Sequence, residues 1–122
     1  MITVSNIERV CDNKVVLPIY SKQSNIIVRA NGDAMNPTLK DGDMLSIREV
    51  NPFGNIFYGN IFVVVTQDYK MVKRVKRYPQ DEKNYVILHS DNPEYDDILF
   101  SRSKIMKLYV VESVLSISRM TI

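Results

Sequence analysis

Short runs in which every second residue is apolar constrain the fold of this chain more than any other feature. Apolar side chains alternate at positions 26, 28 and 30 and again at 45 and 47, and residues 61–65 are apolar throughout. Alternation predicts a strand with one buried face, and a short apolar run bounded by turn residues also favours a strand. Helical signals are confined to residues 37–40, which Asn36 is placed to cap, and to residues 101–106. The sequence therefore predicts a mainly β domain with short helical turns.

Three further strands are predicted in the second half of the chain. Residues 71–75 return from a polar hairpin tip at 66–69, and residues 85–89 form the next apolar run. The last strand, residues 109–117, is apolar on both faces: Tyr109, Val111, Leu115 and Ile117 alternate with Val110 and Val114. Such a strand needs a cover on each face, so we predict that it forms the interface of a homodimer. The alternative is an internal strand paired wholly within its own sheet.

Size and composition fit one self-sufficient domain. The chain has 122 residues, of which 45% are hydrophobic and 25% charged. No stretch reaches the roughly 20 apolar residues that cross a bilayer, and the charged start of the chain lacks the core of a secretion signal, which predicts a cytoplasmic protein without a membrane span. Its lone cysteine, Cys11, and lone histidine, His89, cannot form a disulfide or a Cys/His metal cluster within the chain. No cofactor and no metal are predicted, and both residues are interpreted as inert.

The chain is divided by composition at about residue 25. Pro18 and the polar run 21–25 are typical of an extended arm or linker, so residues 1–25 are assigned to an N-terminal arm and residues 26–122 to the compact domain. Sixteen Lys and Arg against fourteen Asp and Glu give a net charge of +2. This excess is too small for strong binding to phosphates, so the chain by itself is predicted to bind DNA only weakly and without sequence preference.

The densest group of special residues is VRANGDAMNPTLKDGDMLSI, residues 28–47. Turn signals at 32–33, 36–37 and 41–43 place Ala34 and Met35 at a corner after a strand, where a side chain can point into a cleft. Composition alone would also allow a plain loop. A second feature is Lys73, which strand alternation puts on the same face as Met71 and Val75. Burial there would lower the pKa of the amine, although a lysine can also lie along apolar surface with its head in water.

These segments resemble the LexA-type Ser-Lys peptidases, the C-terminal domains of self-cleaving repressors. The resemblance spans about residues 26–117 and implies the partly open, barrel-like β fold shared with signal peptidases. The nucleophile motif is similar at Gly32, Asp33, Ala34, Met35, Pro37, Leu39, Gly42 and Asp43. The second motif is similar at Val72, Lys73 and Arg74, and a later element at Leu88, Ser90, Asn92, Pro93 and Tyr95.

The decisive departure from the family pattern is Ala34, which stands where the family has its nucleophilic serine. A methyl group cannot attack a carbonyl, so the family's peptidase reaction is disabled in this chain. The resemblance assigns Lys73 to the general-base position, which requires a neutral amine. The arm also has no glycine, whereas the family cleaves its linker at a small residue followed by glycine, and bonds such as Cys11–Asp12 are weak substitutes.

Two classes of function remain open at this point. The first is the regulatory and dimerisation domain of a helix-turn-helix transcriptional repressor of phage or LexA type, which would bind DNA only through an N-terminal helix-turn-helix domain absent from this chain. The second is a self-processing serine peptidase in which serine was replaced by alanine. A protein-binding β module would leave the three motifs unexplained. The resemblance also implies a candidate partner, an activated recombinase filament of the kind that acts in the SOS response. The residues themselves do not decide whether this chain binds it.

Overall fold

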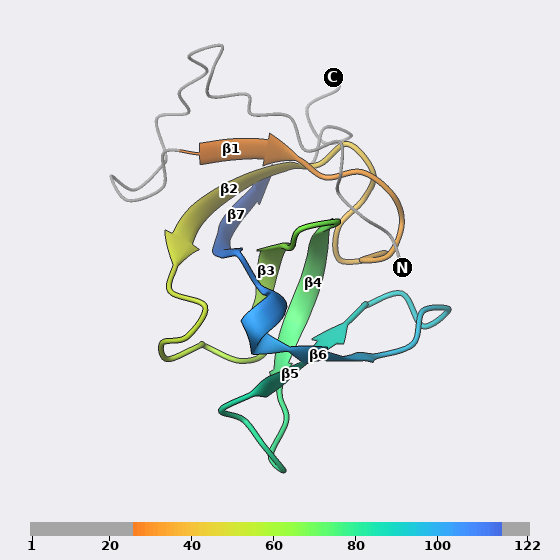
Figure 1. Ribbon diagram of the computed structural model, residues 1–122. Helices are drawn as coiled ribbons and strands as arrows, with labels where there is room; N and C mark the ends of the chain where they lie inside the picture. Colours follow the sequence, from red (N-terminus) through yellow and green to blue (C-terminus); the bar gives the residue numbers. More distant parts are fainter. Residues whose placement is uncertain (1–25, 116–122) are drawn as a thin grey trace, which may run out of the picture.

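The computed structural model describes residues 26–115, which form one antiparallel sheet of seven strands. The sheet has the spatial order β1-β2-β7-β3-β4-β5-β6 and is open, since β1 and β6 are its edges. In Figure 1, β1 lies at the top, β2 and β7 run side by side beneath it, and β5 and β6 lie toward the bottom of the molecule. The strands are β1 Ile26–Arg29, β2 Met44–Val50, β3 Ile61–Val65, β4 Lys70–Arg77, β5 Tyr85–His89, β6 Ile98–Ser101 and β7 Lys107–Leu115. The predicted mainly β class is therefore confirmed.

Apolar side chains pack on both faces of the central strands, as continuous apolar runs require. Val63 of β3 and Val72 of β4 belong to one core, which also contains Leu45 and Ile47 of β2 and closes under the 30–43 segment. Phe62 and Val64 of β3, with Met71 and Val75 of β4, belong to the second core. Alternation thus sends neighbouring residues of one strand into two different cores, so Phe62, Val63 and Val64 of β3 are all buried.

Two predicted helical segments differ from the structure. Residues 37–40 do not form a helix: a turn covers residues 34–38, with backbone hydrogen bonds from Asn36 N to Asp33 O and from Leu39 N to Met35 O. Asn36 does not cap a helix: its Oδ1 is buried and has no hydrogen-bond partner in the described structure. The segment 101–106 contains only a short 3-10 helix, Arg102–Lys104. Strand β6, which precedes it, was not predicted because its four residues alternate too briefly to stand out.

The last strand lies inside the sheet. β7 pairs with β2 along its length and with β3 over residues 107–110. The first half of β7 therefore has a strand of this chain paired on each of its two edges. A bulge at Glu112, between the pairs Ser46–Ser113 and Ile47–Val111, interrupts the alternation that the sequence shows. Beyond Val110, β2 is the only described strand paired with β7. Residues 116 and 117 of the predicted strand, and the whole arm 1–25, lie outside the described residues.

Candidate functional site

The predicted nucleophile motif forms a closed loop between β1 and β2. Gly32 has a φ of 92°, a left-handed conformation that side chains rarely adopt, and its N–H donates to Asp41 Oδ1 at 2.8 Å. At the base of the loop, Ala30 N donates to Asp43 O and Gly42 N donates to Ala30 O, both at 2.8 Å. The Gly-Asp elements therefore act by fixing the backbone of this loop.

Asp43 stabilises the same loop from inside the protein. Its side chain is buried, and Oδ2 accepts a hydrogen bond of 2.8 Å from the N–H of Lys40. The N–H of Asp43 in turn donates to Lys40 O at 3.0 Å. A buried carboxylate is tolerated where it satisfies a backbone donor, so this residue positions the loop and is not available for chemistry at the site.

The loop is docked onto the connection between β5 and β6, residues 90–97. Asn92 makes two of the contacts: its N–H donates to Ala34 O, and its Nδ2 donates to Asp33 O, each at 3.0 Å. Tyr95 adds a third, from its hydroxyl to Asp33 Oδ1 at 2.6 Å. This hydrogen bond raises the pKa of Tyr95, so the phenol stays protonated. Residues 33 and 34 are thus held by backbone and side-chain bonds from a segment almost sixty residues later.

Lys73 has no solvent-exposed surface. It lies on β4 facing the core of Met71 and Val75, as alternation predicted, and its Nζ donates to Ser90 Oγ at 2.5 Å. The same Nζ lies 5.6 Å from the centre of the Tyr95 ring. Burial lowers the pKa of Lys73 below its ordinary value of 10.5, because the charged ammonium loses its hydration. An amine in this position is suited to accept a proton.

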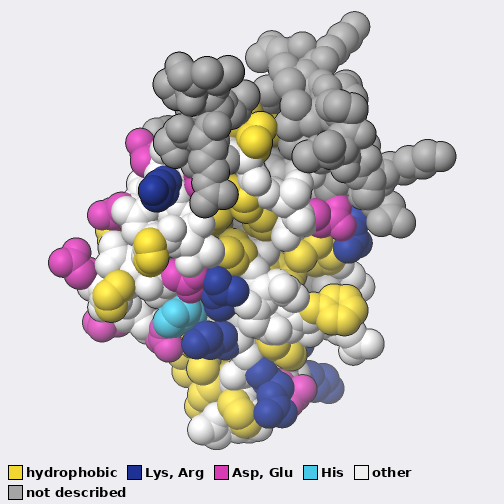
Figure 2. Space-filling model, turned by 180° about the vertical axis from the view of Figure 1, so that it is seen from behind, with side chains coloured by type: hydrophobic (Ala, Val, Ile, Leu, Met, Phe, Trp, Pro, Cys, Tyr) yellow, Lys and Arg dark blue, Asp and Glu magenta, His cyan; other side chains and the backbone are white. Residues whose placement is uncertain are grey.

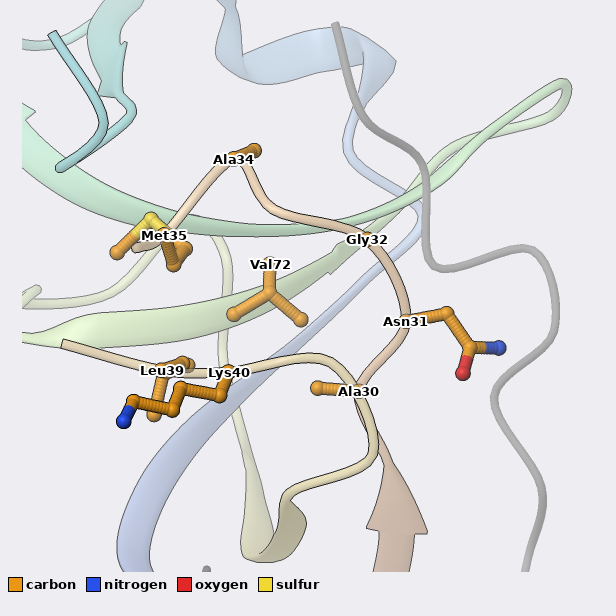
Figure 3. Close-up of a pocket in the computed structure, with 8 residues that line it drawn as sticks. All are labelled: Ala30, Asn31, Gly32, Ala34, Met35, Leu39, Lys40 and Val72. Carbon is orange, nitrogen blue, oxygen red and sulfur yellow. The ribbon is translucent and has the colours of Figure 1, made fainter. Parts of the chain in front are cut away.

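Ala34 and Lys73 are linked through common neighbours. Both contact the 90–95 segment, Ala34 through Asn92 and Lys73 through Ser90 and Tyr95. Ala34 is buried, and it borders a pocket under the loop together with Met35 and Val72. Figure 3 shows this pocket, with the Asn31 side chain pointing away from the other lining residues. Val72, from the opposite face of β4, lines this pocket and Lys73 does not. The pocket's volume is about 10 Å³, which is room for one water and not for a peptide side chain.

Asp91 is a central site residue that the sequence reasoning missed. Its carboxylate accepts two hydrogen bonds from Arg74, Nε to Oδ1 at 3.0 Å and Nη2 to Oδ2 at 2.6 Å, and a third from Thr38 Oγ1 at 2.6 Å. The Arg74 hydrogen bond lowers the pKa of Asp91. The three residues join the motif loop, β4 and the β5–β6 connection. Only the Val-Lys-Arg and Ser-x-Asn-Pro-x-Tyr resemblances pointed to this neighbourhood.

His89, interpreted as inert, is also engaged at the edge of this network. Its Nδ1 lies 2.7 Å from Asp97 Oδ1, and its Nε2 lies 3.6 Å from Asp91 Oδ1. Within residues 26–115, no three His, Cys, Asp or Glu side chains form a group able to hold a metal. The described part of the chain also contains no helix long and apolar enough to cross a bilayer.

Fold and site together define a mainly β domain in which a Gly-Asp-Ala-Met turn and a buried lysine meet at one connection. The chain matches the family model described as Peptidase S24-like over residues 3–111, and it belongs to that family. The family resemblance seen in the sequence is thereby confirmed. The match also takes in most of the segment assigned to an arm. No curated protein matches the chain.

Proposed function

We propose that this chain is the regulatory and dimerisation domain of a helix-turn-helix transcriptional repressor that does not cleave itself. One observation carries the proposal. The base position keeps a fully buried Lys73 with its Nζ on Ser90, while the nucleophile position holds Ala34. This arrangement supports a Ser-Lys site that lacks the atom needed to attack a peptide bond.

DNA recognition, in this proposal, belongs to a helix-turn-helix domain outside this chain. The net charge of +2 gives the chain few phosphate contacts of its own. Its contribution is to join two such domains, so that the second half-site is bound at high effective concentration once the first is occupied. A sequence-specific complex formed by these 122 residues alone, stable in moderate salt, would contradict this division of labour.

The alternative is a self-processing serine peptidase that carries Ala34 in place of serine. The burial of Lys73 favours it, because a lowered amine pKa is what a general base next to a serine requires. In that reaction the neutral Nζ takes the proton of the serine hydroxyl while the oxygen attacks the carbonyl carbon of the scissile bond. The proton then passes to the leaving amine, and water hydrolyses the ester. Reading codon 34 of the encoding gene distinguishes a natural alanine from a replaced serine.

Ala34→Ser tests the proposal directly. We expect the variant to remain intact at alkaline pH, where the amine is most fully deprotonated, because the arm has no bond between a small residue and glycine. Intact mass and peptide mapping after incubation provide the readout. Specific fragments that form in Ala34→Ser and are absent in the double variant Ala34→Ser/Lys73→Met would establish the peptidase instead.

A further inference from the structure

A second polar centre lies at the opposite end of the sheet from the motif loop, around Arg102. This residue is 7% exposed, and within residues 26–115 its guanidinium donates to backbone carbonyls alone. Nη2 donates to Pro52 O at 2.8 Å and to Gly54 O at 2.9 Å, Nη1 donates to Glu82 O at 2.8 Å, and Nε donates to Pro52 O at 3.2 Å. Four of its five N–H groups are used, and the remaining one is on Nη1.

The charge of Arg102 has no acidic partner among residues 26–115. The turn whose Glu82 carbonyl accepts from Arg102 carries two acidic side chains, and both are engaged elsewhere: Asp81 accepts hydrogen bonds from Asn84 Nδ2 at 3.1 Å, and Glu82 pairs with Arg77 at 3.3 Å. A buried cation is normally paired with an anion, because its desolvation is otherwise poorly offset. Carbonyl oxygens satisfy four of its donors but leave its positive charge without a neutralising anion.

Arg102 borders an open pocket of about 450 Å³, within the range of small-ligand sites. Lys83 adds a second cation to the lining, and the hydroxyls of Ser101 and Ser103 add polar groups. Phe53 and Tyr85 line it as well, and both rings are exposed to solvent. In Figure 2, several Lys and Arg side chains lie toward the lower end of the molecule, the end at which β4 passes into β5 in Figure 1, and others lie in its upper half.

We propose that this pocket binds a small organic anion. The carboxylate or phosphate oxygens of the anion accept hydrogen bonds from the remaining Nη1–H of Arg102 and from the Lys83 ammonium. Phe53 and Tyr85 cover the apolar part of the anion. Charge-assisted hydrogen bonds of this kind are the strong polar contacts of a binding site. The inference is independent of the proposed function, since the pocket shares no residue with the Ala34–Lys73 site.

The test is a titration of the whole chain with phenyl phosphate and with benzoate, followed by NMR of the backbone amides. Benzyl alcohol, which has the ring without the charge, is the matched ligand control. We expect one or both anions to shift the amides of residues 83–85 and 101–103, and the tighter of the two identifies the preferred acidic group. Lys83 is exposed, and Lys83→Gln should weaken the affinity for the anion by about fivefold. Lys70→Gln, at the far end of β4, should leave this affinity unchanged.

Three outcomes would overturn the proposal. The first is the absence of shifts in residues 83–85 and 101–103 with both anions. The second is an equal response to benzyl alcohol, which would make the pocket a purely apolar one. The third is unchanged anion affinity in Lys83→Gln, which would leave Arg102 as a structural clamp between the 51–54 loop and the 81–84 turn.

Discussion

Lys73 places an ionisable amine on the face of β4 that otherwise carries Met71 and Val75. It has no exposed surface, and among the described residues its Nζ has one hydrogen-bond partner, Ser90 Oγ. Removing an ammonium from water costs free energy that a single hydroxyl does not return, so burial lowers the pKa of Lys73 and disfavours its charged form. The residue that suits general-base chemistry is therefore also one whose protonation opposes folding.

Lys73 should make the stability of this protein depend on pH in the alkaline range. Its folded pKa lies below the ordinary 10.5, so between these two values the unfolded chain binds more protons and stability rises with pH. We expect the free energy of unfolding of the native chain, relative to Lys73→Met, to increase as the pH rises through the folded pKa toward 10.5. Urea unfolding measures it. The exposed Lys70→Met on the same strand is the control, and an equal pH trend for both variants would contradict the burial argument.

Asp91 is the residue through which three segments are joined, and its loss should be costly. Asp91→Asn keeps the side-chain size but breaks the fork with Arg74, so we expect a loss of about 2 kcal/mol in the free energy of unfolding at neutral pH. Because the Arg74 hydrogen bond holds the folded pKa below 3.8, this contribution is present above 3.8 and is lost as the pH falls through the folded pKa. The difference between native and variant should therefore shrink in acid.

Glu82→Gln is the matched control for Asp91→Asn. The Arg77–Glu82 pair is half exposed on both sides, so its removal should change stability by less than about 0.5 kcal/mol. Equal losses for the two variants would mean that the Asp91 network does not hold the segments together.

At the scale of elements, the connections decide where the strands meet. The β2–β3 connection ends at Gly59, whose N–H donates to Val75 O at 2.8 Å and whose carbonyl accepts from Arg74 Nη1 at 2.6 Å. The same arginine binds Asp91. The connection that starts β3 and the one that follows β5 are thus tied to a single residue of β4.

Two glycines of the β2–β3 connection offer a matched pair. Gly59 has a φ of +91° and open space around it, so Gly59→Ala adds backbone strain without a steric clash. We expect it to cost about 1 kcal/mol or more. Gly54 is not in the left-handed region, and an added Cβ would meet Asn51 at ordinary contact distance, so Gly54→Ala should stay within about 0.5 kcal/mol of the native chain. Thermal or urea unfolding separates them, and equal stability would refute the strain argument.

At the scale of the whole molecule, β7 is the strand that holds the two halves of the sheet together, with β2 on one edge and β3 on the other. Its end carries apolar side chains beyond the region paired with β3, and Val114 is 44% exposed. The internal position accounts for the apolar character of residues 107–110. It leaves the proposed dimer contact to residues 111–115 and the chain that follows.

The dimer is tested by Leu115→Arg. We expect the native chain to sediment as a dimer at micromolar concentration and the variant as a folded monomer, because a charge would be buried in the two-fold contact. Val114→Arg, at an exposed position, gives a second probe that the fold tolerates. Leu99→Arg, on edge strand β6, is the control and should remain dimeric. A monomeric native chain, or folded dimers in both β7 variants, would remove this strand from the interface.

The sequence by itself determined six of the seven strands, the hairpin tip at 66–69, the face of β4 on which Lys73 lies and the family. Each of these depends on local information: alternation sets the face of a side chain, and turn residues set where a strand ends. The spacing of the turn residues likewise predicted the loop from Gly32 to Asp43. Residues 37–40 were predicted wrongly as helix, because Asn36 and Pro37 favour the start of a helix as well as a turn. In the folded protein, the backbone hydrogen bonds that Ala30 makes with Gly42 and Asp43 close the loop and favour the turn.

Only the tertiary structure decided which distant segments meet. Nothing local places β7 between β2 and β3, since strand pairing depends on backbone groups that every residue carries. The bonds from Asn92 and Tyr95 to Asp33 and Ala34, and from Asp91 to Arg74, likewise join residues far apart in the chain. Such contacts form only when the sheet brings the loops to one end, so composition and periodicity do not reveal them. The site is thus a product of the folded sheet, and its chemistry follows from what that sheet buries.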